Sequence, residues 1–198
     1  VPAHASWANG TAAFSNNVFV AAWTLLDDRR ASLYLRDVSG RRSLTLTGEV
    51  FQIVLTNGTR YAASRLVPDG RPRLRSLTPK PNAAQLAARL TGKSVEVPLR
   101  SADGRLRVRW RGIALDGAHY LRQEIELTAV RDSLALQEIV WLDTTRPGAA
   151  TAGRVDGSPI VADNFFLGSE DPMAENVAGP NGSLLSRVRR NTELRRGE

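Results

Sequence analysis

Apolar and polar residues alternate along three consecutive segments between residues 93 and 129. In the middle segment, apolar residues at every second position from Leu106 to Trp110 are separated by arginines, and this period of two is typical of a half-buried strand. Asp103-Gly104 and Asp116-Gly117 separate the segments. Asp-Gly between alternating runs favours a two-residue hairpin turn with positive φ at both central residues. The pattern therefore predicts an antiparallel meander over residues 93–100, 105–114 and 119–129.

A two-residue turn also fixes the pairing register of its hairpin. The first turn predicts Glu96 opposite Arg111, and the second predicts Arg109 opposite Glu124. One face of the meander then carries apolar residues such as Trp110, and the other carries ladders of opposite charge. Cross-strand pairs of this kind contribute about 0.2–1 kcal/mol each.

The four arginines from Arg105 to Arg111 have a second interpretation, as a basic stripe for a polyanion. The formal net charge of +7 raises the same question. However, the predicted register places acids opposite the arginines, and the chain has only two lysines, Lys80 and Lys93. We therefore favour the charge ladder over a nucleic-acid groove and expect no nucleic-acid partner.

Further strand patterns recur along the chain. Val18–Leu26 and Ala31–Val38 flank a predicted turn at Asp27–Arg30, and Asn57-Gly58 is another hairpin signal. Leu134–Leu142 is apolar on both faces, which indicates a central buried strand.

The helical signal is weak by comparison. The one predicted helix is Asn82–Leu90, with Asn82 as its N-cap and Gly92 at its end. Many short strands with at most one short helix favour an all-β antiparallel β-sandwich. We assign residues 1–198 to a single domain. Because the segment from Ser186 to Glu198 has no closing element, we expect the domain to be part of a longer polypeptide.

Few residues offer catalytic or metal-binding chemistry. Cysteine is absent, so thiolate metal sites and disulfides are excluded, and no apolar run reaches the ~20 residues of a membrane span. The only two histidines, His4 in a start that we expect to be frayed and His119 after a turn, are far apart in sequence. No nucleophile elbow or phosphate loop is present. We expect no catalytic residue, metal or cofactor, and no membrane partner.

Four residues are candidates for ligand or interdomain contacts: Trp7, Phe165, Glu170 and Asp171. Adjacent Phe165 and Phe166 point to opposite faces if extended, so one is expected in the core and the other at a partner surface. The loop that contains Glu170 and Asp171 is either an ordinary polar loop or a ligand-facing or interdomain loop. Trp7 lies in a loop-like start and is the best candidate for an exposed, sugar-stacking ring.

Several short motifs resemble one enzyme group. They are Leu106-x-Val108-x-Trp110, Asp116-Gly117-x-x-Tyr120-x-Arg122-Gln123, Gly157-Ser158-Pro159 and Phe165-Phe166-Leu167-Gly168-x-Glu170-x-Pro172-Met173. Together they are similar to the N-terminal galactose-mutarotase-like β-sandwich, or supersandwich, of bacterial glycoside hydrolases of the α-galactosidase and α-N-acetylgalactosaminidase groups. The likeness runs loosely from about Val18 to Glu198. In that family, histidine often occupies the position of Asp171. Any role that depends on that imidazole is therefore not expected in this chain.

The resemblance implies a non-catalytic domain that packs against a downstream (β/α)₈ catalytic barrel of the same polypeptide and contributes to carbohydrate binding. It also favours a secreted or periplasmic protein. A freestanding carbohydrate-binding module is the main alternative. A mutarotase-like enzyme acting alone would require His119 to converge with an acid.

Overall fold

The computed structural model describes residues 1–26, 32–84 and 86–197. Within these residues the secondary structure is almost entirely β, with three short 3₁₀ segments and no α-helix. All strands pair antiparallel within their sheets. The all-β antiparallel class predicted from the sequence is confirmed. The turn predicted at Asp27–Arg30 lies outside the described residues.

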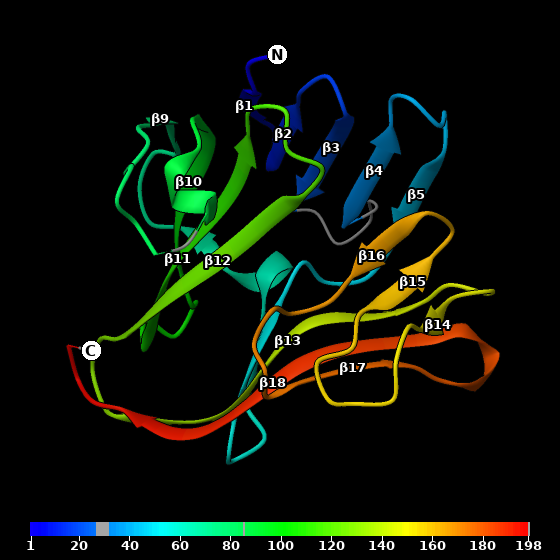
Figure 1. The fold of residues 1–198 in the computed structure, drawn as a ribbon. Coiled ribbons are helices and arrows are strands. Elements are labelled where there is room, and N and C mark those ends of the chain that lie inside the picture. Colours follow the sequence, from blue (N-terminus) through cyan, green and yellow to red (C-terminus); the bar gives the residue numbers. More distant parts are fainter. Residues whose placement is uncertain (27–31, 85, 198) are drawn as a thin grey trace.

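The strands form four sheets (Figure 1). The first is a run of consecutive strands in the order β1-β2-β3-β4-β5. Its members are β1 (His4–Ala8), β2 (Thr11–Ser15), β3 (Phe19–Thr24), β4 (Leu33–Asp37) and β5 (Ser43–Leu46).

The second sheet contains the predicted meander in the order β12-β11-β10, and both β8 and β9 pair with β10. Its members are β8 (Val67–Pro68), β9 (Arg73–Leu77), β10 (Gly92–Arg100), β11 (Leu106–Leu115) and β12 (Leu121–Ala129).

The third sheet has the order β17-β18-β13-β6-β7. Its members are β6 (Gln52–Leu55), β7 (Arg60–Ala62), β13 (Leu134–Thr145), β17 (Ala174–Ala178) and β18 (Ser183–Leu194). The central position predicted for Leu134–Leu142 is confirmed, because β13 lies between β18 and β6. The 3₁₀ segments are η1 (Ala63–Arg65), η2 (Leu86–Arg89) and η3 (Pro180–Gly182).

A small fourth sheet bridges two of the larger ones. It consists of β14 (Ala150–Thr151), β15 (Ile160–Ala162) and β16 (Phe165–Leu167). Figure 1 shows β15 and β16 between β5 and the β17–β18 pair. Its apolar side chains join a separate small cluster around Leu44 and Leu46 of β5.

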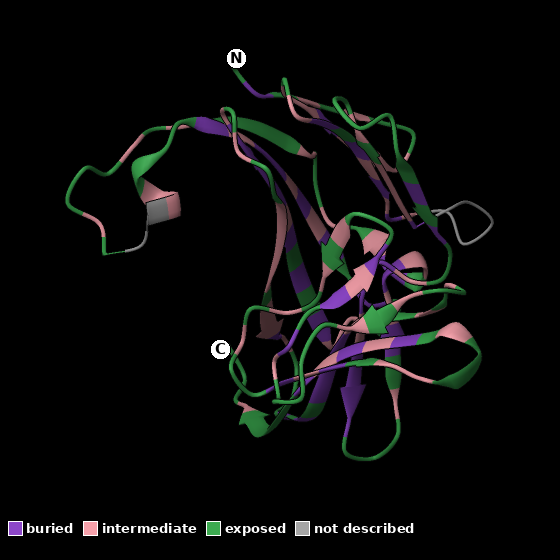
Figure 2. Cartoon of the chain, turned by 45° about the vertical axis from the view of Figure 1, so that its right-hand side comes forward, coloured by how far each residue is buried: buried purple, intermediate pink, exposed green. Residues whose placement is uncertain are grey.

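The main core lies between the first three sheets. Figure 2 shows buried positions alternating with exposed ones along the strands. At its centre, Trp110 is fully buried and its ring packs edge-on against Trp23, with ring centroids 5.5 Å apart. Phe14 also packs edge-on against Trp23, with ring centroids 5.9 Å apart. The apolar face predicted for the meander is therefore part of the core.

The two predicted registers had different outcomes. Glu96 faces Arg111 across β10 and β11, as predicted. Across β11 and β12, however, Arg109 faces Glu126 and Arg111 faces Glu124, so the predicted register was wrong by two residues. The turns also differ from prediction. In each Asp-Gly pair the glycine, Gly104 or Gly117, has a positive φ, whereas the aspartate does not. A shift of two keeps every side chain on its predicted face.

The predicted helix over Asn82–Leu90 is also wrong. Among the described residues of that stretch only η2 is helical, and it is a 3₁₀ turn. The loop instead closes on itself, because Lys80 N donates to Ala88 O (2.8 Å) and the Arg89 guanidinium donates to Ala83 O (2.8 Å).

A buried tyrosine fastens the β10–β11 turn to β7. Tyr61 is 8% exposed and its hydroxyl donates to Asp103 Oδ2 at 2.9 Å. Burial, and then the hydrogen bond to Asp103, raises the pKa of Tyr61 from 10.0 to about 12. Burial opposes ionisation of Asp103 as well, but hydrogen bonds from Ser101 Oγ and Arg105 N hold the pKa of that carboxyl below its usual value.

This contact predicts a loss of stability in alkali. Between pH 10 and about 12 the unfolded chain has lost the Tyr61 proton while the folded chain keeps it, so the folded state binds more protons and stability falls as pH rises. The contribution is complete below pH 10 and can reach about 2–3 kcal/mol. Urea unfolding of the wild type and of Tyr61→Phe across this interval should show a steeper decline for the wild type. Parallel profiles would contradict the prediction.

Candidate functional site

One buried asparagine organises residues 155–177, the segment that contains the predicted contact residues Phe165, Glu170 and Asp171. Asn176 is 6% exposed, and its amide donates to Gly157 O and Ser169 O, each at 3.3 Å. Its Oδ1 accepts from Ser169 N (3.1 Å) and from Ser186 Oγ of β18 (2.7 Å). A backbone bond from Gly157 N to Ala174 O (2.8 Å) completes the arrangement. These bonds fix the loops of the segment to β18, and sequence reasoning did not identify Asn176.

Asp171 is an anchor within this segment. Its Oδ2 accepts from the Arg190 guanidinium at 2.8 Å, and its Oδ1 accepts from Met173 N at 2.9 Å. Both carboxylate oxygens therefore have partners in the folded chain. We infer that Asp171 shapes the loop and presents its neighbours to solvent.

Glu170 has a different environment from Asp171. It is exposed, and burial, followed by the charge of Glu170, raises the pKa of Tyr120, while Arg122 acts in the opposite direction. Glu170 therefore acts electrostatically on Tyr120, a residue about fifty positions earlier in the sequence.

The two phenylalanines of β16 point to opposite faces, as predicted. Phe165 is partly buried and packs against the small cluster of Leu44, Leu46 and Ala162, whereas Phe166 is 71% exposed. The side chain available for a partner is therefore Phe166. Phe165, the candidate chosen from the sequence, contributes to packing.

Exposed apolar side chains are concentrated on the same segment. Met173 is 77% exposed, Val155 76% and Phe166 71%, and Val177 is exposed as well. Apart from the terminal Val1, no other large apolar side chain among the described residues has an exposed fraction as high as these three. We call Val155, Phe166 and Met173 the apolar surface of the 155–177 segment. These side chains are the candidates for an apolar contact with a partner.

Trp7 and His4 were predicted in a loose N-terminal loop, and this prediction is wrong. Both lie on β1, which pairs with β2 along its whole length. Trp7 is partly buried and packs against the main core. Its ring is therefore engaged in packing, because β1 alternation directs it inward.

The arginine stripe of the meander is a charge ladder. Arg109 donates to Glu126 at 2.7 Å, and Arg111 contacts Glu124. Arg107 lies 3.0 Å from Asp69, and Arg105 lies 3.9 Å from Asp132. Each arginine of the stripe thus has a carboxylate within 4.0 Å, and the stripe is not an uncompensated basic surface.

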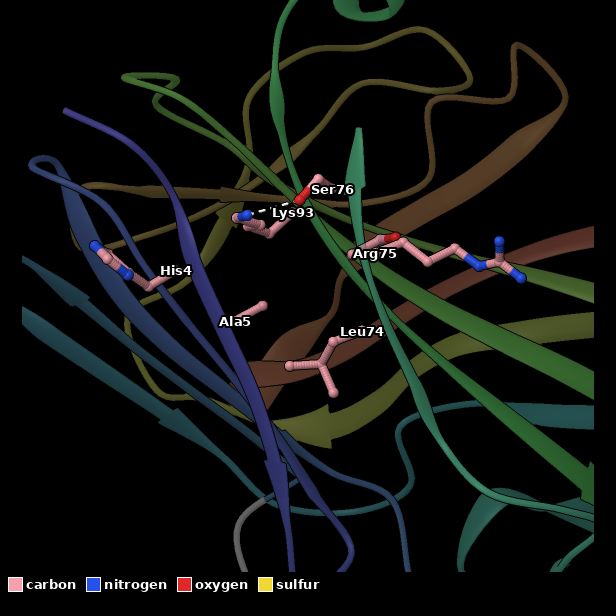
Figure 3. A pocket seen from close by; sticks show the side chains of 7 residues that line it. His4, Ala5, Leu74, Arg75, Ser76 and Lys93 are labelled. Carbon is pink, nitrogen blue, oxygen red and sulfur yellow. Dashed lines mark hydrogen bonds between the residues drawn. The ribbon is translucent and has the colours of Figure 1, made fainter. Parts of the chain in front are cut away.

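A hollow of about 180 Å³ lies between β1, β9 and β10. Figure 3 shows the Lys93 ammonium bonded to Ser76 Oγ (2.8 Å) in this hollow, with the His4 imidazole on the other side of β1. The hydroxyl of Ser94 is buried and has no partner among the described residues. Ser94 pairs with Arg75, and neighbouring Lys93 pairs with Ser76. The two side chains therefore point to opposite faces and do not form one anion site.

Metal-binding and membrane-spanning features are absent from residues 1–26, 32–84 and 86–197. No group of three or more histidine or carboxylate side chains there is arranged to hold a metal ion. In the same residues, no helix has the length and apolar character needed to cross a bilayer. Comparison with protein-family models, curated proteins and solved structures finds no match for this chain.

Proposed function

We propose that this chain is the non-catalytic, galactose-mutarotase-like β-sandwich domain of a bacterial glycoside hydrolase. In this proposal it packs against a (β/α)₈ catalytic barrel that follows it in the same polypeptide. The apolar surface of the 155–177 segment makes the contact, and it is the observation that carries the proposal. Val155, Phe166 and Met173 are all more than 70% exposed, although burying such side chains is worth about 1.5–3 kcal/mol each.

Two further features support an interface at this place. Asn176 and Asp171 hold the loops of the segment in fixed positions, so little conformational entropy is lost when a partner binds. Exposed Glu170 belongs to the same segment and supplies part of the polar rim that interfaces commonly have. The resemblance of these residues to the family motifs points to a glycoside hydrolase as the parent enzyme.

The coding frame after Glu198 tests the architecture, because the proposal requires a following series of βα units. The chain and that barrel, produced as two polypeptides, should form a complex measurable by calorimetry. Phe166→Ser combined with Met173→Ser should weaken it at least about tenfold, because both apolar contacts are lost. Leu74→Ser on β9, which is 54% exposed, is the matched control and should leave the affinity unchanged.

The chain alone should not hydrolyse aryl glycosides. Turnover that is abolished by Glu170→Gln would overturn the non-catalytic assignment, as would activity that depends on His119. Failure of the two polypeptides to associate, or an affinity that the double variant does not change, would overturn the assignment of the interface.

A further inference from the structure

A second hollow lies on the outer, charged face of the meander. Its volume is about 120 Å³, and it is lined by Glu96, Arg109, Arg111, Glu124, Ile125 and Glu126. The side chains come from three adjacent strands, β10, β11 and β12. It is separate from the 155–177 segment.

Glu96 differs from the other carboxylates of this hollow. Its side chain is only 15% exposed, yet its oxygens lie 3.9 Å from Arg109 Nε and 4.0 Å from Arg75 Nε. Among the described residues, no direct hydrogen bond to this carboxylate is found. By contrast, Glu126 and Glu124 accept hydrogen bonds from arginines directly.

The distances around Glu96 suit an intervening oxygen atom. Separations near 4 Å are too long for a hydrogen bond but allow one oxygen to lie within hydrogen-bonding distance of both groups. Glu96 thus has two nearby cations, but a largely buried carboxylate that accepts no direct hydrogen bond is costly. Such an oxygen must donate to Glu96 and accept from the guanidinium of Arg109. A hydroxyl group does both.

The charges of the hollow favour a neutral ligand. Three carboxylates and two guanidinium groups line it, and Arg75 and Arg122 contact Glu96 and Glu124 from beside it, so the opposite charges compensate one another. A metal ion is disfavoured because the carboxylates are engaged by arginines and form no metal-binding group within the described residues. The guanidinium groups donate hydrogen bonds and the carboxylates between them accept, so the lining instead matches a ligand with neighbouring hydroxyl groups, each of which can donate and accept.

We propose that this hollow binds adjacent hydroxyl groups of a neutral sugar ring. One hydroxyl bridges Glu96 and Arg109, and its neighbour reaches the Arg111–Glu124 pair. The inference extends the proposed function by adding a sugar-binding site, and it does not depend on the apolar surface of the 155–177 segment.

The test is a titration of the 198-residue chain with methyl α-galactoside and methyl α-glucoside, followed by NMR or calorimetry. We expect a Kd in the millimolar range. Glu96→Gln should weaken binding at least about tenfold, since it removes a charged acceptor. Glu193→Gln, the same change at an exposed position on β18, should alter Kd by less than about twofold. Arg109→Lys, which keeps the charge but moves the donor, should weaken binding as well.

Other outcomes would overturn the proposal. One is the absence of saturable binding at about 50 mM glycoside. Another is equal sugar affinity of the wild type and Glu96→Gln. Either result would mean that only ordered water occupies the hollow. Tighter binding of galacturonate that falls steeply with added salt would identify an anion site instead. The Phe166/Met173 double variant should bind sugar normally, so this site and the interface can fail independently.

Discussion

Replacing Trp110 by alanine should lower the free energy of unfolding by about 3–5 kcal/mol, the usual cost of removing a buried tryptophan. The ring is fully buried on β11 and packs edge-on against Trp23. Its Nε1 also donates to Gln123 Oε1 at 3.0 Å. Alanine therefore leaves a cavity, removes an aromatic pair and deprives a partly buried amide of its partner.

Denaturant unfolding of the wild type and the variant measures this loss. Trp7→Ala is the control, because Trp7 packs at the edge of the same core and is only partly buried. It should cost clearly less than Trp110→Ala. A loss below about 1 kcal/mol for Trp110→Ala would show that the main core does not depend on this ring.

The meander shows how far local sequence patterns reach. Alternation predicts which face of β10, β11 and β12 is buried, because a strand directs successive side chains to opposite faces. The second register failed because the β11–β12 connection is longer than the Asp-Gly signal indicates. Asn16 of a distant strand connection donates to Leu115 O (3.0 Å) and Ala118 O (2.9 Å) and holds this connection in place. A local sequence pattern cannot predict a contact between residues that are about a hundred positions apart.

The failed helix has a different cause. The stretch Asn82–Leu90 is rich in alanine and leucine, residues with high helix propensity. A helix of this length is marginal without a packing partner. The backbone bond from Lys80 to Ala88 closes a loop there instead.

The candidate site was predictable only in part. Alternation foretold that Phe165 and Phe166 would face opposite ways. The choice between them was decided by Leu44 and Leu46 of β5, which are more than a hundred residues earlier in the sequence. The buried position of Asn176 and the lack of a direct hydrogen bond to Glu96 were not predicted, because an asparagine among turn residues and a glutamate in an alternating strand are ordinary. Their roles depend on which groups the fold brings near them.

Removing the Arg187 side chain should also destabilise the fold strongly. Glu138 of β13 is 6% exposed, and Arg187 of β18 donates to its Oε2 at 3.2 Å. The same guanidinium donates to both oxygens of Glu175, at 2.9 and 3.1 Å. Arg187→Leu leaves the Glu138 carboxylate buried without its cation, which typically costs about 3–5 kcal/mol.

Two further variants separate this mechanism from a general effect of losing an arginine. Arg189→Leu removes a more exposed neighbour on β18, 3.6 Å from Glu175, and should cost less than about 1 kcal/mol because exposed ion pairs contribute little. Adding Glu138→Leu to Arg187→Leu should recover part of the loss, since the unpaired buried charge is then absent. Equal losses for the two arginine variants, or no recovery in the double variant, would show that the β13–β18 pairing tolerates an unpaired Glu138.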